Sequence, residues 1–102
     1  MSAPRNAYAV LQPDGSERVI WVSGRPQWAL DELLAAGAEG CTPIDHPGPR
    51  WSDYVFKLKR RYGLSIETIH EPHSGEFPGH HGRYILKSRV VRLSEADEQV
   101  AA

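Results

Sequence analysis

The chain has 102 residues, of which 40% are hydrophobic and 25% are charged. This balance is typical of one globular domain and differs from that of a disordered chain, which has fewer apolar residues. The single cysteine, Cys41, excludes an internal disulfide, and no stretch approaches the roughly 20 apolar residues that cross a bilayer. The first residues also lack the apolar run of a signal peptide, so we expect a cytoplasmic protein.

The formal net charge of −1 hides an uneven distribution of charged residues. Residues 50–92 hold nine Lys/Arg and four Asp/Glu, a balance of +5, whereas the rest of the chain holds three and nine, a balance of −6. Such a division predicts one basic surface on an otherwise acidic body. The alternative is chance clustering of cations on a solvated helix.

The N-terminal part of the sequence predicts a β-hairpin over residues 7–22. Residues 7–11 and 18–22 favour strands, and Pro-Asp-Gly at 13–15 favours a turn, because proline presets φ and glycine accepts a positive φ. A helix is expected next, over residues 25–37. Its apolar side chains recur at near-helical spacing and Gly37 is a suitable end.

The middle of the chain, residues 40–49, is rich in residues that interrupt helices. Thr42 followed by Pro43 is typical of an N-cap and a first helical position. Pro47 and Pro49 limit any helix here to about one turn.

Residues 50–62 are the most clearly predicted helix. One apolar stripe runs along it, formed by Trp51, Tyr54, Val55, Leu58 and Tyr62. Gly63 ends the helix. The opposite face is mostly polar and basic, with Ser52, Asp53, Phe56, Lys57, Lys59 and Arg60.

Residues 64–93 predict a second hairpin, with strands at 64–70 and 83–93. The connecting loop, 71–82, is rich in Gly, Pro and His and has the length of a projecting tip. We expect Phe56 to pack under this hairpin. The whole domain then covers residues 7–93, and residues 1–6 and 94–102 are expected to be disordered tails.

The order of these elements is that of a helix-turn-helix followed by a projecting hairpin. An α-helix fits the major groove of B-DNA if its inner face is anchored by apolar side chains and its outer face carries donors. The N-terminal end of such a helix points toward base edges, and Arg50 lies there. The candidate DNA contacts are Arg50, Ser52, Lys57, Lys59, Arg60, His73, His80, His81, Arg83 and Lys87.

Four segments carry a resemblance to a known family: GCTPI at 40–44, RWSDYVFKLK at 50–59, GLSIETI at 63–69 and GRYIL at 82–86. The sequence resembles the small winged-helix family common in phage and prophage regions. This resemblance implies an α+β winged helix, here with an added N-terminal β-hairpin, that binds double-stranded DNA and regulates transcription. It also implies that the helix holding residues 57–61 is the recognition helix. The prolines at 43, 47 and 49 depart from the family's full second helix.

Two other kinds of function fit the sequence. A winged helix can serve as a protein–protein interaction module, for which the acidic first half offers a second charged face. A metal or catalytic site would have to use the histidines with Cys41, but their spacing matches no standard zinc site and no nucleophile–base arrangement is evident. We therefore expect no metal, cofactor, catalytic residue or small-molecule substrate. For a homodimer, the candidate interface is formed by the strand edges of the N-terminal hairpin.

Overall fold

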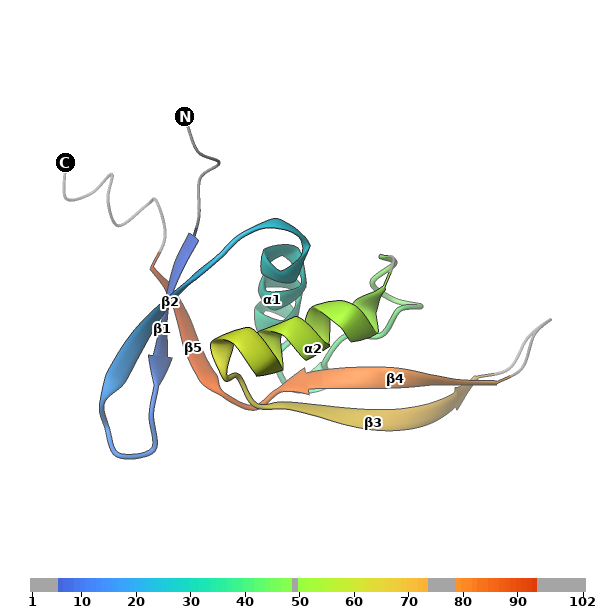
Figure 1. Cartoon of the computed structure of the whole chain (residues 1–102). Coiled ribbons are helices and arrows are strands. Elements are labelled where there is room, and N and C mark those ends of the chain that lie inside the picture. Colours follow the sequence, from blue (N-terminus) through green and yellow to red (C-terminus); the bar gives the residue numbers. More distant parts are fainter. Residues whose placement is uncertain (1–5, 49, 74–78, 94–102) are drawn as a thin grey trace.

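The computed structural model describes residues 6–48, 50–73 and 79–93. Within these segments two strands precede the helices and three follow them, and the predicted α+β class is confirmed. Figure 1 shows the elements in space. Their bounds are β1 (Asn6–Leu11), β2 (Glu17–Val22), α1 (Gly24–Ala36), the 3-10 helix η1 (Gly37–Glu39), α2 (Trp51–Tyr62), β3 (Ile66–His73), β4 (Gly79–Leu86) and β5 (Arg89–Leu93).

The predicted N-terminal hairpin corresponds to β1 and β2. The turn between them is closed by two backbone hydrogen bonds, from Gln12 N–H to the Ser16 carbonyl (2.7 Å) and from Gly15 N–H to the Gln12 carbonyl (3.0 Å). Gly15 has a φ of 92°, which explains why glycine follows Pro-Asp here. β5 pairs with the other edge of β1, so the sheet has three antiparallel strands in the order β2-β1-β5.

The predicted strand at 83–93 is wrong as a single strand, because the structure divides it into β4 and β5. The amides of Lys87 and Ser88 both donate to the Ser65 carbonyl, at 2.8 and 3.3 Å, and the Ser88 hydroxyl accepts from the Ser65 amide at 2.8 Å. These bonds turn the chain between the two strands. β4 therefore pairs with β3, and β5 pairs with β1.

The predicted loop at 71–82 is also corrected, because β3 continues to His73 and β4 already begins at Gly79. Glu71 pairs with His81 and Pro72 with His80. Proline is tolerated there because β3 is an edge strand. Residues 74–78 lie outside the described residues, as do 1–5 and 94–102.

Asn6, which we expected in the N-terminal tail, is the first residue of β1 and is buried. Its side-chain oxygen accepts a hydrogen bond from Arg92 of β5. Arg92 also forms an ion pair with Asp31 of α1 at 3.0 Å, and Asp31 accepts the Tyr8 hydroxyl at 2.6 Å. Burial, together with the hydrogen bond to Asp31, raises the pKa of Tyr8. The network joins β1, β5 and α1.

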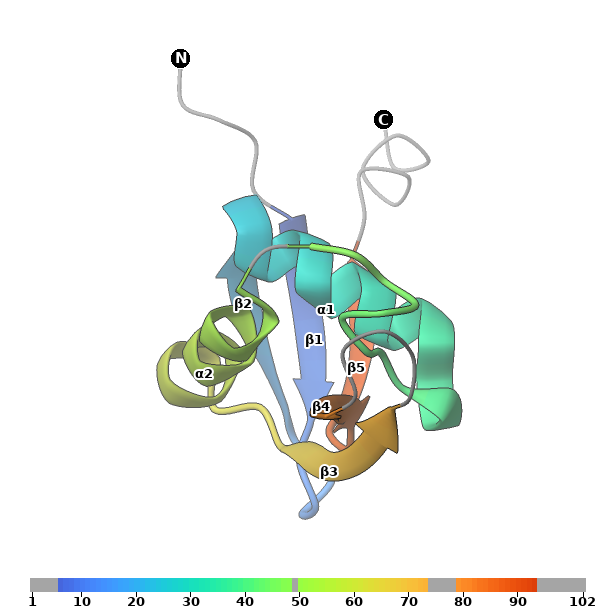
Figure 2. The same cartoon turned by 90° about the vertical axis from the view of Figure 1, so that its right-hand side faces the viewer.

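The main core lies where α1 covers one face of the three-stranded sheet, as Figure 2 shows. Apolar side chains of β1, β2, α1, α2 and the second sheet fill it; the largest fully buried ones are Tyr8, Leu30, Leu33, Leu58 and Val22. Arg18 of β2 donates to the Tyr62 carbonyl, so a cation lies at the C-terminal end of α2.

A single turn occupies residues 42–46, and Pro47 directly after it prevents a longer helix, as predicted. The Thr42 hydroxyl accepts the Asp45 amide at 3.0 Å, and the Thr42 carbonyl accepts the His46 amide at 2.8 Å. Just before it, Cys41 exchanges two backbone hydrogen bonds with Tyr84, each 2.8 Å long. The segment thus lies beside β4 on the side away from β3. Burial raises the pKa of the Cys41 thiol to about 11, so it stays protonated at neutral pH as a small core side chain.

Candidate nucleic-acid interface

The helix α2 divides into a buried face and an exposed face, as its sequence predicts. Trp51, Tyr54, Val55 and Leu58 are buried, and Tyr62 is half-buried. On the other side, the exposed residues are Ser52, Phe56, Lys59, Arg60 and Arg61. The exposed face is therefore held in place by an apolar stripe but takes no part in the core itself.

Both ends of α2 are defined by residues with left-handed backbone. At the C-terminal end, Gly63 has a φ of 66°, and the amides of Gly63 and Leu64 donate to the Lys59 and Leu58 carbonyls at 3.1 and 3.2 Å. At the N-terminal end, Arg50 has a φ of 65° and ψ of 42°. Among the described residues, Arg50 alone has a positive φ without being glycine. This conformation costs a residue with a Cβ about 1–2 kcal/mol.

The cations of α2 differ in their surroundings. Lys57 forms an ion pair with Asp53 one turn earlier, at 3.1 Å. Lys59, Arg60 and Arg61 have no carboxylate partner within the described part of the chain. The Arg60 guanidinium lies 5.7 Å from the centre of the Phe56 ring. The uncompensated positive charge of α2 is thus concentrated in its C-terminal half.

An open groove of about 450 Å³ separates the exposed face of α2 from the β3–β4 hairpin. The residues that line it come from α2 and both strands: Ser52, Val55, Phe56, Lys59, Arg60, Thr68, His70 and Tyr84. We refer to it below as the α2–β3 groove. Our expectation that Phe56 packs under the hairpin is wrong, because its side chain lines the groove and stays 57% exposed.

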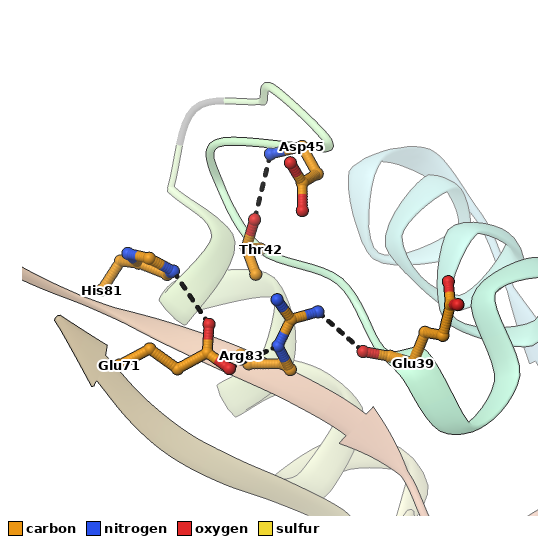
Figure 3. A network of polar contacts seen from close by, with 6 residues as sticks. All are labelled: Glu39, Thr42, Asp45, Glu71, His81 and Arg83. Atoms are coloured by element: carbon orange, nitrogen blue, oxygen red, sulfur yellow. Dashed lines mark hydrogen bonds and ion pairs between the residues drawn. The ribbon is translucent and has the colours of Figure 1, made fainter. Parts of the chain in front are cut away.

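The other face of the hairpin carries charges that are already paired. Glu71 binds Arg83 at 2.6 Å and His81 at 3.1 Å, and Arg83 also donates to the Glu39 carbonyl at 2.8 Å, as Figure 3 shows. The hydrogen bond from Arg83 lowers the pKa of the Glu71 carboxyl. Lys87 pairs with Glu67 at 3.4 Å.

The structure brings together only part of the predicted set. Ser52, Lys59 and Arg60 share the α2–β3 groove, and Arg50 lies at the start of the same helix. By the strand alternation and register, His81 and Arg83 lie on the face of the hairpin that is turned away from this groove, and Lys87, just after β4, pairs with Glu67 of that same face. His73 and His80 belong to β3 and β4, but their side chains lie outside the described part of the structure.

Two groove residues, Thr68 and His70, are missing from the predicted contacts. The alternation of side chains between the two faces of β3 could have identified them. Ile66 is buried, so residues two and four positions later lie on the same face as Ile66, toward α2. Histidines are frequent between residues 70 and 81, and their frequency alone does not show which of them point toward α2.

Two other kinds of feature are absent from the described ranges. No group of three or more His, Cys, Asp or Glu side chains is placed to bind a metal ion among the residues that the structure describes. Neither described α-helix has the length and apolar character needed to cross a membrane.

Comparison with known proteins identifies the arrangement. A family model described as a winged helix domain matches residues 19–96, which includes α1, α2 and the β3–β4 hairpin. No curated protein and no solved structure matched the chain in the same comparison. The match begins inside β2, so β1 lies before the part that the family model covers.

Proposed function

Because the chain belongs to the winged-helix domain family, we propose that it binds double-stranded DNA through α2 and the α2–β3 groove. The observation that carries the proposal is the pair Lys59 and Arg60, which line the α2–β3 groove, are exposed, and form no ion pair with a described carboxylate. Exposed cations are stable in water without ion-pair partners, so it is the position of these two beside the groove that favours a phosphate backbone as the anion that they bind.

In this proposal α2 enters the major groove with its exposed face toward the bases. The helix has 12 residues and is therefore roughly 18 Å long, which is enough to cross the groove. Arg50 and Ser52 at its start are the candidates for base-edge contacts. Lys59 and Arg60 are the candidates for phosphate contacts, and His70 supplies a further donor from the hairpin.

The backbone of Arg50 supports a functional role for this side chain. Glycine or asparagine would satisfy a left-handed position at lower cost, yet the position holds a long cation that is exposed and begins the helix. Strain of this kind is common where a side chain serves binding more than stability. We infer that the resulting activity is regulation of transcription, the usual use of a small domain that presents one helix to DNA.

The test is binding of the purified protein to labelled random-sequence duplex DNA across a salt series. We expect saturable binding whose affinity falls steeply with salt. Lys59→Ala and Arg60→Ala are each expected to weaken binding on every sequence and to reduce the log–log slope by about 0.9, the value for one phosphate contact. Arg25→Ala, which removes one exposed cation from α1, is the control matched in charge.

Two outcomes would contradict the proposal. The first is no binding even at low salt. The second is an equal effect of Arg25→Ala and Lys59→Ala, since that would mean attraction by overall charge without a defined contact surface.

The exposure of Phe56 favours one second candidate, a protein-interaction module. Interfaces are rich in aromatic side chains with neighbouring arginine, and Phe56 with Arg60 forms such a pair. For this function the isolated protein would not retain DNA at physiological salt. Phe56→Ala would then abolish capture of the partner, while Lys59→Ala would leave it nearly unchanged.

A further inference from the structure

The three-stranded sheet has one face that no described helix covers. The apolar side chains that point toward α1 are mostly buried, including Tyr8, Val10, Ile20 and Val22. The alternate side chains point the other way, and several are large, apolar and exposed. They are Trp21 (52% exposed), Val91 (52%), Val19 (42%) and Leu93 (38%). Figures 1 and 2 show both α-helices on the opposite side of this sheet.

The strand register arranges this outer face in three rows. Ala7 lies between Trp21 and Leu93, and Ala9 lies between Val19 and Val91. The third row has Leu11 at its centre, with Glu17 on the β2 edge and Arg89 on the β5 edge. Two rows are therefore wholly apolar, and the third carries one charge of each sign at opposite edges. Single exposed apolar residues are ordinary, but four that adjoin on one sheet face are typical of an interaction surface.

We propose that this outer face is a homodimer interface, in which two copies pack sheet against sheet about a two-fold axis parallel to β1. This axis places β2 of one copy over β5 of the other. Trp21 then lies over the partner's Leu93, Val19 over the partner's Val91, and Glu17 over the partner's Arg89. Because the contact is two-fold, each pairing occurs twice. Aligned sheets pack in this way, about 10 Å apart.

Charge complementarity selects a second copy as the occupant. Within the described residues Glu17 and Arg89 have no ion-pair partner, although both lie beside apolar side chains. The alternative axis, perpendicular to the strands, would place Trp21 over the partner's Glu17 and Leu93 over the partner's Arg89, which leaves both charges unpaired. Residues 94–102 are a poor cover for this face, because they contain three carboxylates and one large apolar residue, Val100.

This surface differs from the hairpin edges that the sequence analysis considered, since it uses the face of all three strands and needs β5. It is also separate from the α2–β3 groove, which no residue of β1, β2 or β5 lines. The homodimer can therefore be tested independently of DNA binding.

The test is sedimentation equilibrium of the full chain over a range of protein concentrations. We expect a monomer–dimer equilibrium for the natural sequence. Glu17→Arg or Arg89→Glu alone places like charges opposite each other twice, so each is expected to weaken dimerisation at least about tenfold. The double variant restores both ion pairs in reversed sense and is expected to restore the dimer.

A double variant that dimerises again shows that the single substitutions act on the ion pair and not on folding. Circular dichroism and thermal melting of all four proteins check the folding directly. A protein that stays monomeric at the highest concentration overturns the proposal. So does a dimer that neither single substitution weakens, or one that the double substitution fails to restore, because either result places the interface elsewhere.

Discussion

The indole ring of Trp51 stacks on the phenol ring of Tyr84, with centroids 5.8 Å apart and planes inclined by 13°. Trp51 is the first residue of α2, and Tyr84 lies in β4. The indole N–H also donates to the His46 carbonyl at 2.7 Å. One side chain therefore fixes the start of the helix relative to both the hairpin and the preceding turn.

Trp51→Phe is expected to destabilise the protein by about 1–3 kcal/mol, because the His46 carbonyl loses its donor in a partly buried place. Chemical denaturation measures the change. Tyr84→Phe is the control, since it keeps the stacked ring and the hydroxyl has no hydrogen-bond partner within the described part of the chain; it is expected to change the free energy of unfolding by less than about 0.5 kcal/mol. Equal effects of the two substitutions would show that the hydrogen bond from Trp51 to His46 adds no measurable stability.

Arg50→Gly is expected to separate stability from DNA binding. Glycine relieves the left-handed strain, so the free energy of unfolding is expected to stay the same or rise by up to about 1 kcal/mol. DNA affinity is expected to fall, by about 1–3 kcal/mol if Arg50 contacts a base edge. Thermal melting and DNA titration of the same preparation measure both quantities. A variant that binds as tightly as the natural protein would remove Arg50 from the interface.

Gly40→Ala is expected to be strongly destabilising, because a Cβ there would lie 2.5 Å from the Tyr84 carbonyl oxygen and 2.7 Å from Ile85 Cγ1. Gly37→Ala is the matched control. Gly37 has a similar φ, 58° against 72°, but its Cβ would meet nothing within 4 Å. The difference between the two variants thus isolates the steric contact with β4 from the backbone strain that both share. Unfolding by denaturant measures it, and equal stabilities would contradict the close approach of this segment to β4.

Stability at acidic pH is expected to depend on Glu71. Its pKa is lowered from 4.5 in the folded protein, because Arg83 donates a hydrogen bond to the carboxylate. A group whose pKa is lowered by folding contributes stability above its unfolded pKa, and this contribution is lost as the pH falls through the folded pKa. Glu71→Gln is therefore expected to reduce the decline of the melting temperature below about pH 5.

Arg83→Gln provides the control for this pH effect. It removes the donor that lowers the pKa, so it is expected to reduce the acid-side decline in the same way, and the double variant is expected to add nothing further. Parallel melting curves for Glu71→Gln and the natural protein would mean that the pair contributes nothing to acid stability.

The sequence predicts those parts of the fold whose signals are local. The apolar stripe places the buried face of α2, and Pro-Asp-Gly places the turn between β1 and β2. The break between β4 and β5 has no local signal, because it depends on hydrogen bonds to Ser65, more than twenty residues earlier. No glycine or proline marks it.

For the candidate site, too, the sequence predicts only the relationships between residues that are close along the chain. The pairing of Lys57 with Asp53 follows from their spacing of four residues on a helix, and the sequence alone could have given it. The pairing of Arg83 with Glu71 could not be foreseen in this way, because it requires the register of two strands across the 74–78 segment. A count of charges along the chain treats Lys57 and Arg83 as available for DNA, whereas in the structure each forms an ion pair with a carboxylate.

The position of β5 has a consequence for how the protein is made. Among the described residues β5 is the last strand, yet it pairs with β1, the first. During synthesis the β1–β2 hairpin emerges early but has only two strands, and such a hairpin is marginally stable by itself. The sheet is completed only after residue 93 has left the ribosome, and it closes a loop of nearly the whole domain. Formation of the three-stranded sheet therefore waits for the synthesis of β5, and a message truncated before β5 would yield an open sheet edge that exposes apolar residues of the core.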